Sequence, residues 1–231
     1  MSAPHNQKHE FRPPACLVVA KAPVPGQVKT RLGARIGLHR SAELAAAALL
    51  DTFEVCTATF GPSRCHLALA GDLSEAVGAA EFDQALSGWQ VRPQRGEGLA
   101  HRLAHAHADV SGPVLQIGMD TPQLTPALLQ EVVDGLVDHD AVLGPADDGG
   151  WWVLAVREAS YAAVVAGVPM SSPQTYQATR AALLEAGLSV GVCTMLRDVD
   201  EATDADIVAE QAPSTRFART WAQGEPQVVA R

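Results

Sequence analysis

Short apolar runs alternate with amphipathic stretches along most of the chain. The runs are short enough for buried strands, and between them apolar side chains recur every three or four residues, as on one face of a helix. The predicted strands are residues 15–20, 65–70, 89–93, 114–118, 141–144, 151–156 and 188–193. The predicted helices are residues 41–59, 74–86, 97–110, a helix starting at 125–126, one from 172–173 to about 187, and 203–211.

This alternation predicts an α/β domain with a mainly parallel sheet covered by helices on both faces. Strand 151–156 follows strand 141–144 too soon for a crossover, so we expect it to run antiparallel to that strand or to splay away from it. At the start of one helix, Thr125 is expected as N-cap and Pro126 as the first helical residue. Ligands bind such sheets beyond the carboxyl ends of the strands, so the residues after each strand are the candidate site.

The 231 residues suit a single domain, expected over residues 13–211 between a flexible arm (1–12) and a C-terminal tail (212–231). A hydrophobic content of 47% excludes a wholly disordered chain, and a net charge of −9 argues against non-specific nucleic-acid binding. Four cysteines without a C-x-x-C pair, and no apolar run long enough for a membrane span, predict a cytoplasmic protein with reduced thiols. The alanine-rich helix at 41–59 suits either the core or a homodimer interface.

A basic loop follows the first strand, with the sequence KAPVPGQVKTRL at residues 21–32. Its prolines and glycine predict a shaped turn rather than a helix, and its cations suit phosphate groups that backbone N–H groups also contact. The residues expected to contact phosphate are Lys21, Pro25, Gly26, Lys29, Thr30 and Arg31, with Lys29 and Arg31 acting on the reacting groups. The alternative is an ordinary solvated surface loop.

Carboxylates follow two further strands. Asp120 comes just after Gly118 at the end of strand 114–118, where a hard oxygen ligand suits Mg²⁺ or Mn²⁺ bridging substrate phosphates. The alternative for Asp120 is a turn residue. Asp147 and Asp148 follow strand 141–144 within GPADDGG, an ambiguous segment that also fits an Asp-Gly hairpin turn. Its glycines, Gly149 and Gly150, allow positive φ and close approach of a ligand.

Acidic residues near the end of the chain form a further candidate. In the RDVD segment, Asp198 and Asp200 share one side if the backbone is extended, and either could join Asp120 at a metal. Asp204 and Asp206 are interpreted as helix N-terminal charges. His101 and His105 are interpreted as a solvated helix face, because they point away from the apolar stripe. The polar turn at 94–98 is a weak candidate for contacting a base or acceptor.

Taken together, KAPxPGxVKTRL, GxDxPxL at 118–124, GPAxDGG at 144–150 and DVD at 198–200 resemble the DUF2064 family. This family lies in the GT-A nucleotide-diphospho-sugar transferase superfamily, and some of its members are classed as bacterial glycosyltransferases. The resemblance spans about residues 15–210. More distantly, the layout is similar to phospholactate guanylyltransferases and molybdenum-cofactor nucleotidyltransferases.

The resemblance implies a GT-A fold, a three-layer α/β/α arrangement with a mixed sheet. It implies phosphates on the basic loop, with Gly118, Gly149 and Gly150 beside the nucleotide, and a divalent ion on Asp120 with Asp200 as second ligand. In the family pattern the second acid directly precedes the glycine pair, so we expect Asp148 to matter more for function than Asp147. The sequence departs from the family at GGWW (149–152), MSSP (170–173) and RGEGL (95–99), on the expected acceptor side.

Three functions are compatible with these residues. The first is nucleotidyl transfer from a nucleoside triphosphate to a phosphorylated small molecule, with the basic loop on the pyrophosphate and Asp120 and Asp200 on Mg²⁺ or Mn²⁺. The second is glycosyl transfer from a nucleotide sugar to a small-molecule acceptor, with Asp147 or Asp148 as base. The third is non-catalytic nucleotide binding.

Overall fold

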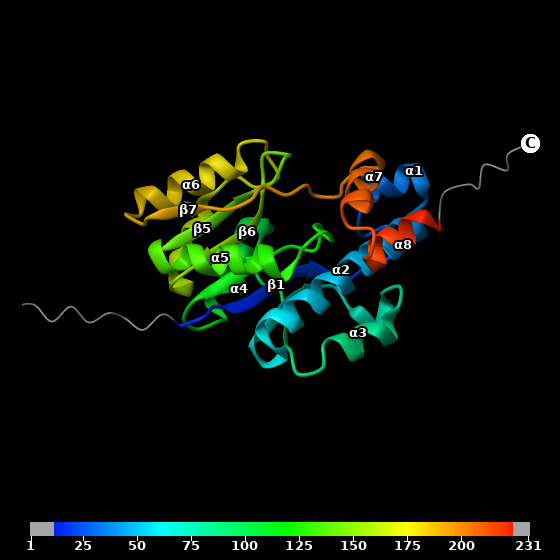
Figure 1. Ribbon diagram of the computed structural model, residues 1–231, viewed down its shortest axis with the longest axis horizontal. Helices are drawn as coiled ribbons and strands as arrows, with labels where there is room; N and C mark the ends of the chain where they lie inside the picture. The colour runs from blue at the N-terminus through cyan, green and yellow to red at the C-terminus, as the bar shows by residue number, and fades with distance from the viewer. Residues whose placement is uncertain (1–11, 224–231) are drawn as a thin grey trace, which may run out of the picture.

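A single seven-stranded sheet organises the computed structural model, which describes residues 12–223 (Figure 1). Residues 1–11 of the predicted arm and residues 224–231 of the predicted tail therefore lie outside the described residues. The strands are β1 (Ala15–Lys21), β2 (Cys65–Ala70), β3 (Gln90–Pro93), β4 (Val114–Ile117), β5 (Ala141–Pro145), β6 (Trp151–Val156) and β7 (Val190–Val192). All seven coincide with predicted strands to within a few residues.

The strand order is β3-β2-β1-β4-β6-β5-β7. Every pairing that excludes β6 is parallel, whereas β6 runs antiparallel to both β4 and β5. The predicted mainly parallel sheet and the antiparallel direction of residues 151–156 are thus confirmed. Because β6 is reversed, it begins at the edge where β4 and β5 end, and the β5–β6 turn lies at that edge too.

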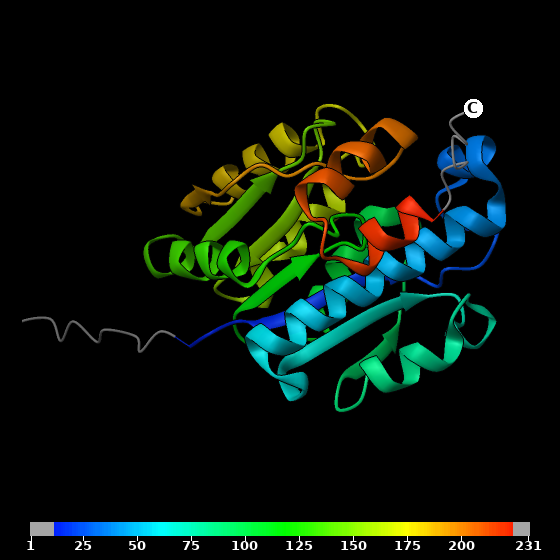
Figure 2. The same cartoon turned by 45° about the vertical axis from the view of Figure 1, so that its right-hand side comes forward.

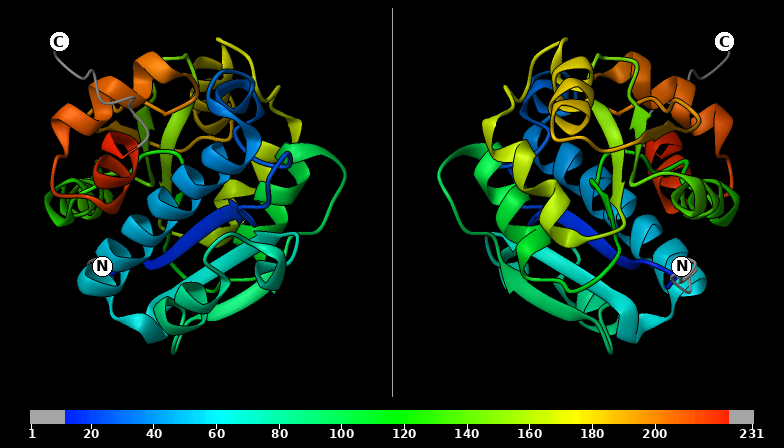
Figure 3. Two further views of the ribbon diagram at one scale, coloured as in Figure 1. Left: turned by 90° about the vertical axis from the view of Figure 1, so that its right-hand side faces the viewer. Right: turned by 90° about the vertical axis from the view of Figure 1, so that its left-hand side faces the viewer.

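Helices cover both faces of the sheet, which confirms the three layers (Figure 3). The α-helices are α1 (Thr30–Ile36), α2 (Leu38–Phe60), α3 (Ala79–Ala85), α4 (Gly98–Ala108), α5 (Pro126–Asp138), α6 (Thr175–Glu185), α7 (Ala202–Gln211) and α8 (Arg216–Ala222), and the 3-10 helices are η1 (Pro62–Arg64), η2 (Leu73–Glu75) and η3 (Ala159–Gly167). Side chains of α2, α3 and α5 share one apolar core with the sheet, and those of α4, η3 and α6 share the other. Thr125 caps α5 as predicted, since its hydroxyl accepts from Leu128 N.

The alanine-rich helix α2 is part of the core. Ala42, Ala45 and Ala46 are buried in the same apolar cluster as the sheet, and α8 packs along the helix in Figure 2. Small side chains let a long helix lie close to the strands. These alanines pack against other residues of the same chain, so their presence does not indicate a homodimer interface. All four cysteines are buried and unbridged, as expected for structural thiols.

Four segments differ from the sequence expectation. The basic segment turns helical at Thr30, because the prolines and glycine that break a helix all precede it, and Leu32 and Ile36 then share one face. Residues 74–86 divide into η2 and α3 at Gly78, whose φ of 74° interrupts the helix. The 3-10 helix η3 and helix α8 were not predicted. Within α8, Phe217 is buried against α2 and α7, so the part of the predicted tail at residues 216–222 is a helix packed on the domain.

None of the helices within residues 12–223 is long and apolar enough to cross a membrane.

Candidate functional site

The basic loop and Asp120 are neighbours because the strands before them are neighbours. β1 and β4 pair in parallel, with Val18 opposite Ile117, so the chain leaves both strands at the same edge. The backbone N–H of Lys21 contacts the sulfur of Met119 at 3.3 Å, which ties the start of the loop to the segment carrying Asp120. The predicted grouping of these two segments is therefore present.

Lys29 occupies the space between two carboxylates. Its Nζ lies 2.5 Å from Asp120 Oδ1 and 3.2 Å from Asp200 Oδ1. Arg31 reaches the other oxygen of Asp200, with Nη1 to Oδ2 at 3.4 Å. The Lys29 side chain is only 10% exposed, whereas that of Arg31 is 76% exposed. The Lys29 end of the inner ion pairs is thus shielded from solvent, although the side chains of Asp120 and Asp200 are 40% and 44% exposed, and the outer pair is well screened.

The backbone holds Lys29 in an unusual conformation. Its φ of 45° and ψ of 42° place it in the left-handed region, which costs a non-glycine residue about 1–3 kcal/mol. Lys29 precedes α1 as N-cap, and its carbonyl accepts from Gly33 N at 2.7 Å. Lys29 and Arg31 therefore contact the same carboxylate from the start of a helix.

Apolar side chains lie beneath the ion pairs. Leu32, Leu44, Val199 and Phe217 line a small cavity together with Lys29 and Asp120. Burial of the Lys29 ammonium lowers its pKa, but the charges of Asp120 and Asp200 raise it by more, so the net shift of the Lys29 pKa is upward. The ammonium is therefore charged at neutral pH.

The segment carrying Asp198 and Asp200 is fastened across the carboxyl edge of the sheet. Val199 N donates to Asp120 O at 2.9 Å, and Gln123 Nε2 donates to Arg197 O at 2.7 Å. Val199 is buried, and both aspartates line the same cavity, as the alternation of the segment predicts.

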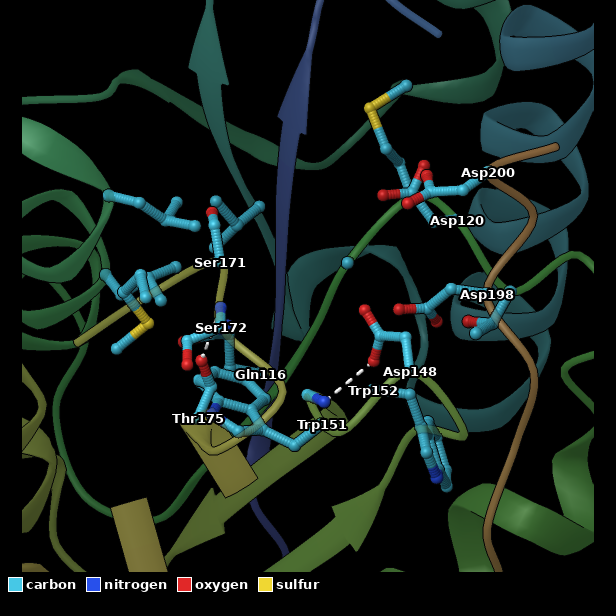
Figure 4. Close-up of a pocket in the computed structure, with 18 residues that line it drawn as sticks. Gln116, Asp120, Asp148, Trp151, Trp152, Ser171, Ser172, Thr175, Asp198 and Asp200 are labelled. Carbon is cyan, nitrogen blue, oxygen red and sulfur yellow. Dashed lines mark hydrogen bonds between the residues drawn. The ribbon is translucent and has the colours of Figure 1, made fainter. Parts of the chain in front are cut away.

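The two adjacent acids of the β5–β6 turn have different surroundings. Asp147 points to Arg197, with Oδ2 2.6 Å from Nη2. Asp148 instead faces the cavity, where its Oδ1 accepts from Gly150 N at 2.7 Å (Figure 4). Gly149 has a φ of 90°, and a Cβ there would lie 2.1 Å from Pro173 O. The close approach that this glycine permits is to the chain itself.

Four aspartates line one cavity of about 300 Å³ at the carboxyl edge of the sheet: Asp120, Asp148, Asp198 and Asp200 (Figure 4). Its opposite side carries Trp151, Met170 and the hydroxyls of Ser171, Ser172 and Thr175. No Lys, Arg or His among residues 12–223 lines this aspartate cavity.

A second cavity of about 300 Å³, the basic cavity, lies over the loop. Lys21, Gln27, Lys29, Thr30 and Arg31 line it. Asp120 and Asp200 line both cavities, so these two carboxylates form a shared wall between cationic and anionic surroundings.

The polar pair Gln116–His107 lies at the base of the aspartate cavity. Gln116, in β4, lines the cavity, and its Oε1 lies 2.9 Å from His107 Nε2. Burial lowers the pKa of His107 to about 4, so the imidazole is neutral. Its Nδ1 has no partner among the described residues, which favours the proton on Nε2. The amide N–H groups of Gln116 are then the part available to the cavity.

The structure places most of the predicted site residues on the two cavities, and three elsewhere. Lys21, Lys29, Thr30, Arg31, Gly118, Asp120, Asp148, Gly150 and Asp200 line one cavity or both. Pro25, Gly26 and Gly149 line neither, because the first two shape the loop and the third packs on Pro173. His101 and His105 are exposed, as expected, and Asp204 completes a capping box with Glu201.

Sequence reasoning missed part of the site. Gln116 is hidden within an apolar strand pattern, although an amide in a buried strand is itself a signal. Trp151 and Ser172 belong to the GGWW and MSSP segments, which the family resemblance places on the expected acceptor side, but neither was named as a site residue. Thr175 gave no positional signal, and Gln27 was overlooked beside its charged neighbours. In the polar turn considered for base contact, Gln94 Nε2 donates to the carbonyls of Ala20 and Ala68.

A stability profile against pH should reveal the crowding of the carboxylates. Burial, followed by the charges of Asp120 and Asp148, raises the pKa of Asp198 to about 7. An unfolded Asp titrates near pH 4, so folding becomes less favourable as pH rises from about 4 to about 7 and the effect is constant above that. In metal-free buffer, Asp198→Asn should therefore gain melting temperature over the wild type across this window. Asp83→Asn, on exposed α3, is the control, and a pH-independent difference for Asp198→Asn would contradict the assignment.

Solved structures share this architecture. A protein of Desulfovibrio desulfuricans, assigned provisionally as a nucleotide-diphospho-sugar transferase, is 28% identical and superposes with a TM-score of 0.75, covering 90% of this chain and 92% of that chain. A nucleotidyl transfer enzyme of Methanothermobacter is 18% identical, with a TM-score of 0.51 and coverage of 89% and 99%. The 4-diphosphocytidyl-2C-methyl-D-erythritol synthase of Anaerococcus prevotii is 11% identical, with a TM-score of 0.54 and coverage of 91% and 98%.

The last two likenesses show the fold alone, and with the first they confirm the predicted GT-A fold, shared by nucleotidyltransferases and nucleotide-sugar transferases. None of the curated proteins matches the chain in sequence. The model of the family described as "Uncharacterized protein conserved in bacteria (DUF2064)" matches residues 52–172. That range covers more than half of the chain and contains both Asp120 and Asp148, so the protein belongs to the DUF2064 family.

Proposed function

We propose that the protein is a divalent-metal-dependent transferase that uses a nucleotide, and that it transfers a nucleotidyl group from a nucleoside triphosphate to a phosphorylated small molecule. One observation carries this proposal: a cationic cavity and an acidic cavity share the wall formed by Asp120 and Asp200. The cationic cavity suits the phosphates of the nucleotide, and the acidic cavity suits the acceptor. The reacting phosphorus would lie where the two cavities meet, beside Asp120 and Asp200. The fold, common among nucleotidyltransferases, supports the same assignment.

The basic cavity suits the pyrophosphate part of the nucleotide. Lys21, Lys29 and Arg31 supply positive charge, and the loop before α1 supplies backbone N–H groups. In an acidic protein this charge acts locally, since the net charge of −9 repels anions at long range. Charge-assisted hydrogen bonds from these residues would stabilise the charge that develops on the leaving group.

The carboxylates suit a hard divalent cation. Asp120 and Asp200 present oxygen donors, and an ammonium already lies within 2.5 Å and 3.2 Å of them as a stand-in cation. Within residues 12–223, no three acidic, His or Cys side chains form a ready-made metal site, which is consistent with Lys29 holding the two carboxylates. When bound, Mg²⁺ or Mn²⁺ would neutralise charge on the phosphate oxygens and orient them for in-line displacement.

In this reaction an oxygen of the acceptor phosphate attacks the α-phosphorus. The bond from the α-phosphorus to the bridging oxygen breaks, and pyrophosphate leaves with the electron pair. The acceptor phosphate would lie at the shared wall, and its organic part in the aspartate cavity. The lining there combines Trp151 and Ser171 with four carboxylates, which accept hydrogen bonds from hydroxyl groups and repel anions, so it favours an organic part that bears hydroxyl groups and no further negative charge.

The aspartate cavity also favours a second candidate, glycosyl transfer from a nucleotide sugar. Hydroxyl groups, an aromatic ring and a carboxylate that faces the cavity, Asp148, are groups that contact a sugar and its acceptor. In that reaction Asp148 would take the proton of the acceptor hydroxyl as the new glycosidic bond forms. The bond from the sugar to the phosphate breaks, and a nucleoside diphosphate leaves with the electron pair.

A melting screen tests both candidates. Each nucleoside triphosphate and a panel of nucleotide sugars is added with and without Mg²⁺, and a ligand at a hundred times its Kd should stabilise the protein by about 2.7 kcal/mol. We expect a Mg²⁺-dependent rise for a triphosphate that Asp120→Asn abolishes. Because this variant also loses the ion pair from Lys29, the rise is measured against the melting temperature of the same variant without ligand. A rise for nucleotide sugars alone would favour glycosyl transfer, and no rise for either class would contradict both candidates. Binding without turnover in a small-molecule extract would leave a non-catalytic nucleotide-binding protein.

The adjacent acids offer a matched pair of variants. Asp148→Asn should lower kcat/KM for the acceptor at least about tenfold, since general bases contribute about 10²–10⁴-fold and a positioning contact contributes less. A loss in kcat would identify a base, and a rise in KM a contact to the acceptor. Asp147→Asn removes an ion pair with Arg197 instead, so it should leave kcat/KM within a few-fold. The assay follows release of pyrophosphate or nucleoside diphosphate, and equal effects of both variants would refute the placement of Asp148.

A further inference from the structure

We propose that Lys29 is a built-in counter-ion that couples metal binding to nucleotide binding: its ammonium fills the Asp120–Asp200 gap in the nucleotide-free protein and moves to the phosphates when a metal–nucleotide complex arrives. This inference rests on the proposed function and deepens it. It states how an otherwise anionic site stays stable when empty, and why its two ligands should enter together.

The position of the ammonium carries the inference. Lys29 Nζ contacts one oxygen of Asp120 and one of Asp200, at 2.5 Å and 3.2 Å. These are carboxylate oxygens that a divalent ion at the shared wall would need. An ammonium that stays on these oxygens would repel a divalent ion bound to the same carboxylates, since like charges a few ångströms apart repel and the Lys29 side chain is only 10% exposed. Metal binding therefore favours departure of Lys29 from the two carboxylates.

The surrounding charges explain why Lys29 is held there. Four carboxylates line the aspartate cavity, and no cationic residue of the described chain lines it with them. Arg31 reaches only Asp200, from a largely exposed position. Lys29, at 10% exposure, is the buried cation of this group, so the acids attract it most strongly when no metal is present.

Lys29 also has a second position available. Its side chain lines the basic cavity as well as contacting the shared wall. Its backbone is held by the left-handed conformation and by the hydrogen bond from Gly33 N, so rotation of the flexible side chain is the change required. A phosphate in the basic cavity would receive the ammonium that the metal displaces from the carboxylates.

The coupling is reciprocal by thermodynamic necessity. A metal alone must displace Lys29 with no compensating partner, and a nucleotide alone must draw Lys29 away from two acids. Each ligand should therefore bind weakly by itself and strengthen the other, by a factor in the usual range of about 5–150.

Titration of the nucleotide-free protein with Mn²⁺ alone, followed by the electron paramagnetic resonance signal of the free ion, tests this directly. Lys29→Met keeps an unbranched, flexible side chain of nearly the same length and removes the charge, so it should bind Mn²⁺ about tenfold tighter than the wild type, or more. Lys29→Arg keeps the charge and should show no gain. Arg35→Ala, on the exposed side of α1, removes a nearby charge without touching the acids and should match the wild type. Lys29→Gln provides a second neutral variant if Lys29→Met fails to fold.

A second measurement separates failure of this inference from failure of the proposed function. Calorimetry measures how far Mg²⁺ strengthens binding of the nucleotide selected by the melting screen, in the wild type and in the neutral variant. We expect a large enhancement in the wild type and a much smaller one in the variant. Tight Mn²⁺ binding by the nucleotide-free wild type, or no gain in the neutral variants, would overturn the role of Lys29 while leaving the metal site intact. No Mn²⁺ binding by any protein, with or without nucleotide, would overturn the proposed function and this inference together.

Discussion

The ion pairs from Lys29 to Asp120 and Asp200 hold the carboxyl edge of the sheet together. They join the loop after β1, the segment after β4 and the segment before α7, which are separated by up to 171 positions in the sequence. The Lys29 side chain is nearly buried and lies beside apolar side chains that include Phe217. Solvent therefore screens its attraction to the two carboxylates less than it screens a fully exposed ion pair. The strained backbone at Lys29 shows that the surrounding structure determines its conformation. In the protein without ligand, the Lys29 ammonium also neutralises part of the negative charge of Asp120 and Asp200.

Sheet topology determines which groups can reach that edge. β1 and β4 are parallel neighbours, so the basic loop and Asp120 emerge side by side. The reversal of β6 brings the β5–β6 turn, and with it Asp148, to the same edge. Gly149 then packs on Pro173 and brings the hydroxyl-bearing loop at 170–175 against the cavity. The turn before β6 and the loop at 170–175 thus both line the aspartate cavity.

The placement of Asp120 at the carboxyl edge could be predicted, because it closely follows β4 and the parallel order of the strands fixes where that strand ends. Lys29 and Asp200 lie further along the loops after β1 and β7, so the sequence could assign only their segments to this edge. The antiparallel direction of β6 could also be predicted, because its connection to β5 is too short for a crossover. The distinction between Asp147 and Asp148 could not be derived from spacing, since it depends on Arg197, fifty positions away in the sequence. Gln116 and His107 form a pair across two elements, and α8 owes its burial to Phe217 meeting α2 and α7. Such contacts between distant segments leave no local pattern.

In the proposed binding mode, a divalent ion takes the place of the Lys29 ammonium between Asp120 and Asp200. The ammonium then pairs with nucleotide phosphates in the basic cavity. Anomalous diffraction from crystals of the protein with Mn²⁺ and a non-hydrolysable nucleoside triphosphate measures this most directly. The account predicts a manganese peak bound by Asp120 and Asp200, the phosphates in the basic cavity, and Lys29 Nζ moved from the carboxylates to a phosphate oxygen. Phosphates bound elsewhere, or Lys29 still paired with both aspartates beside a bound nucleotide, would contradict it.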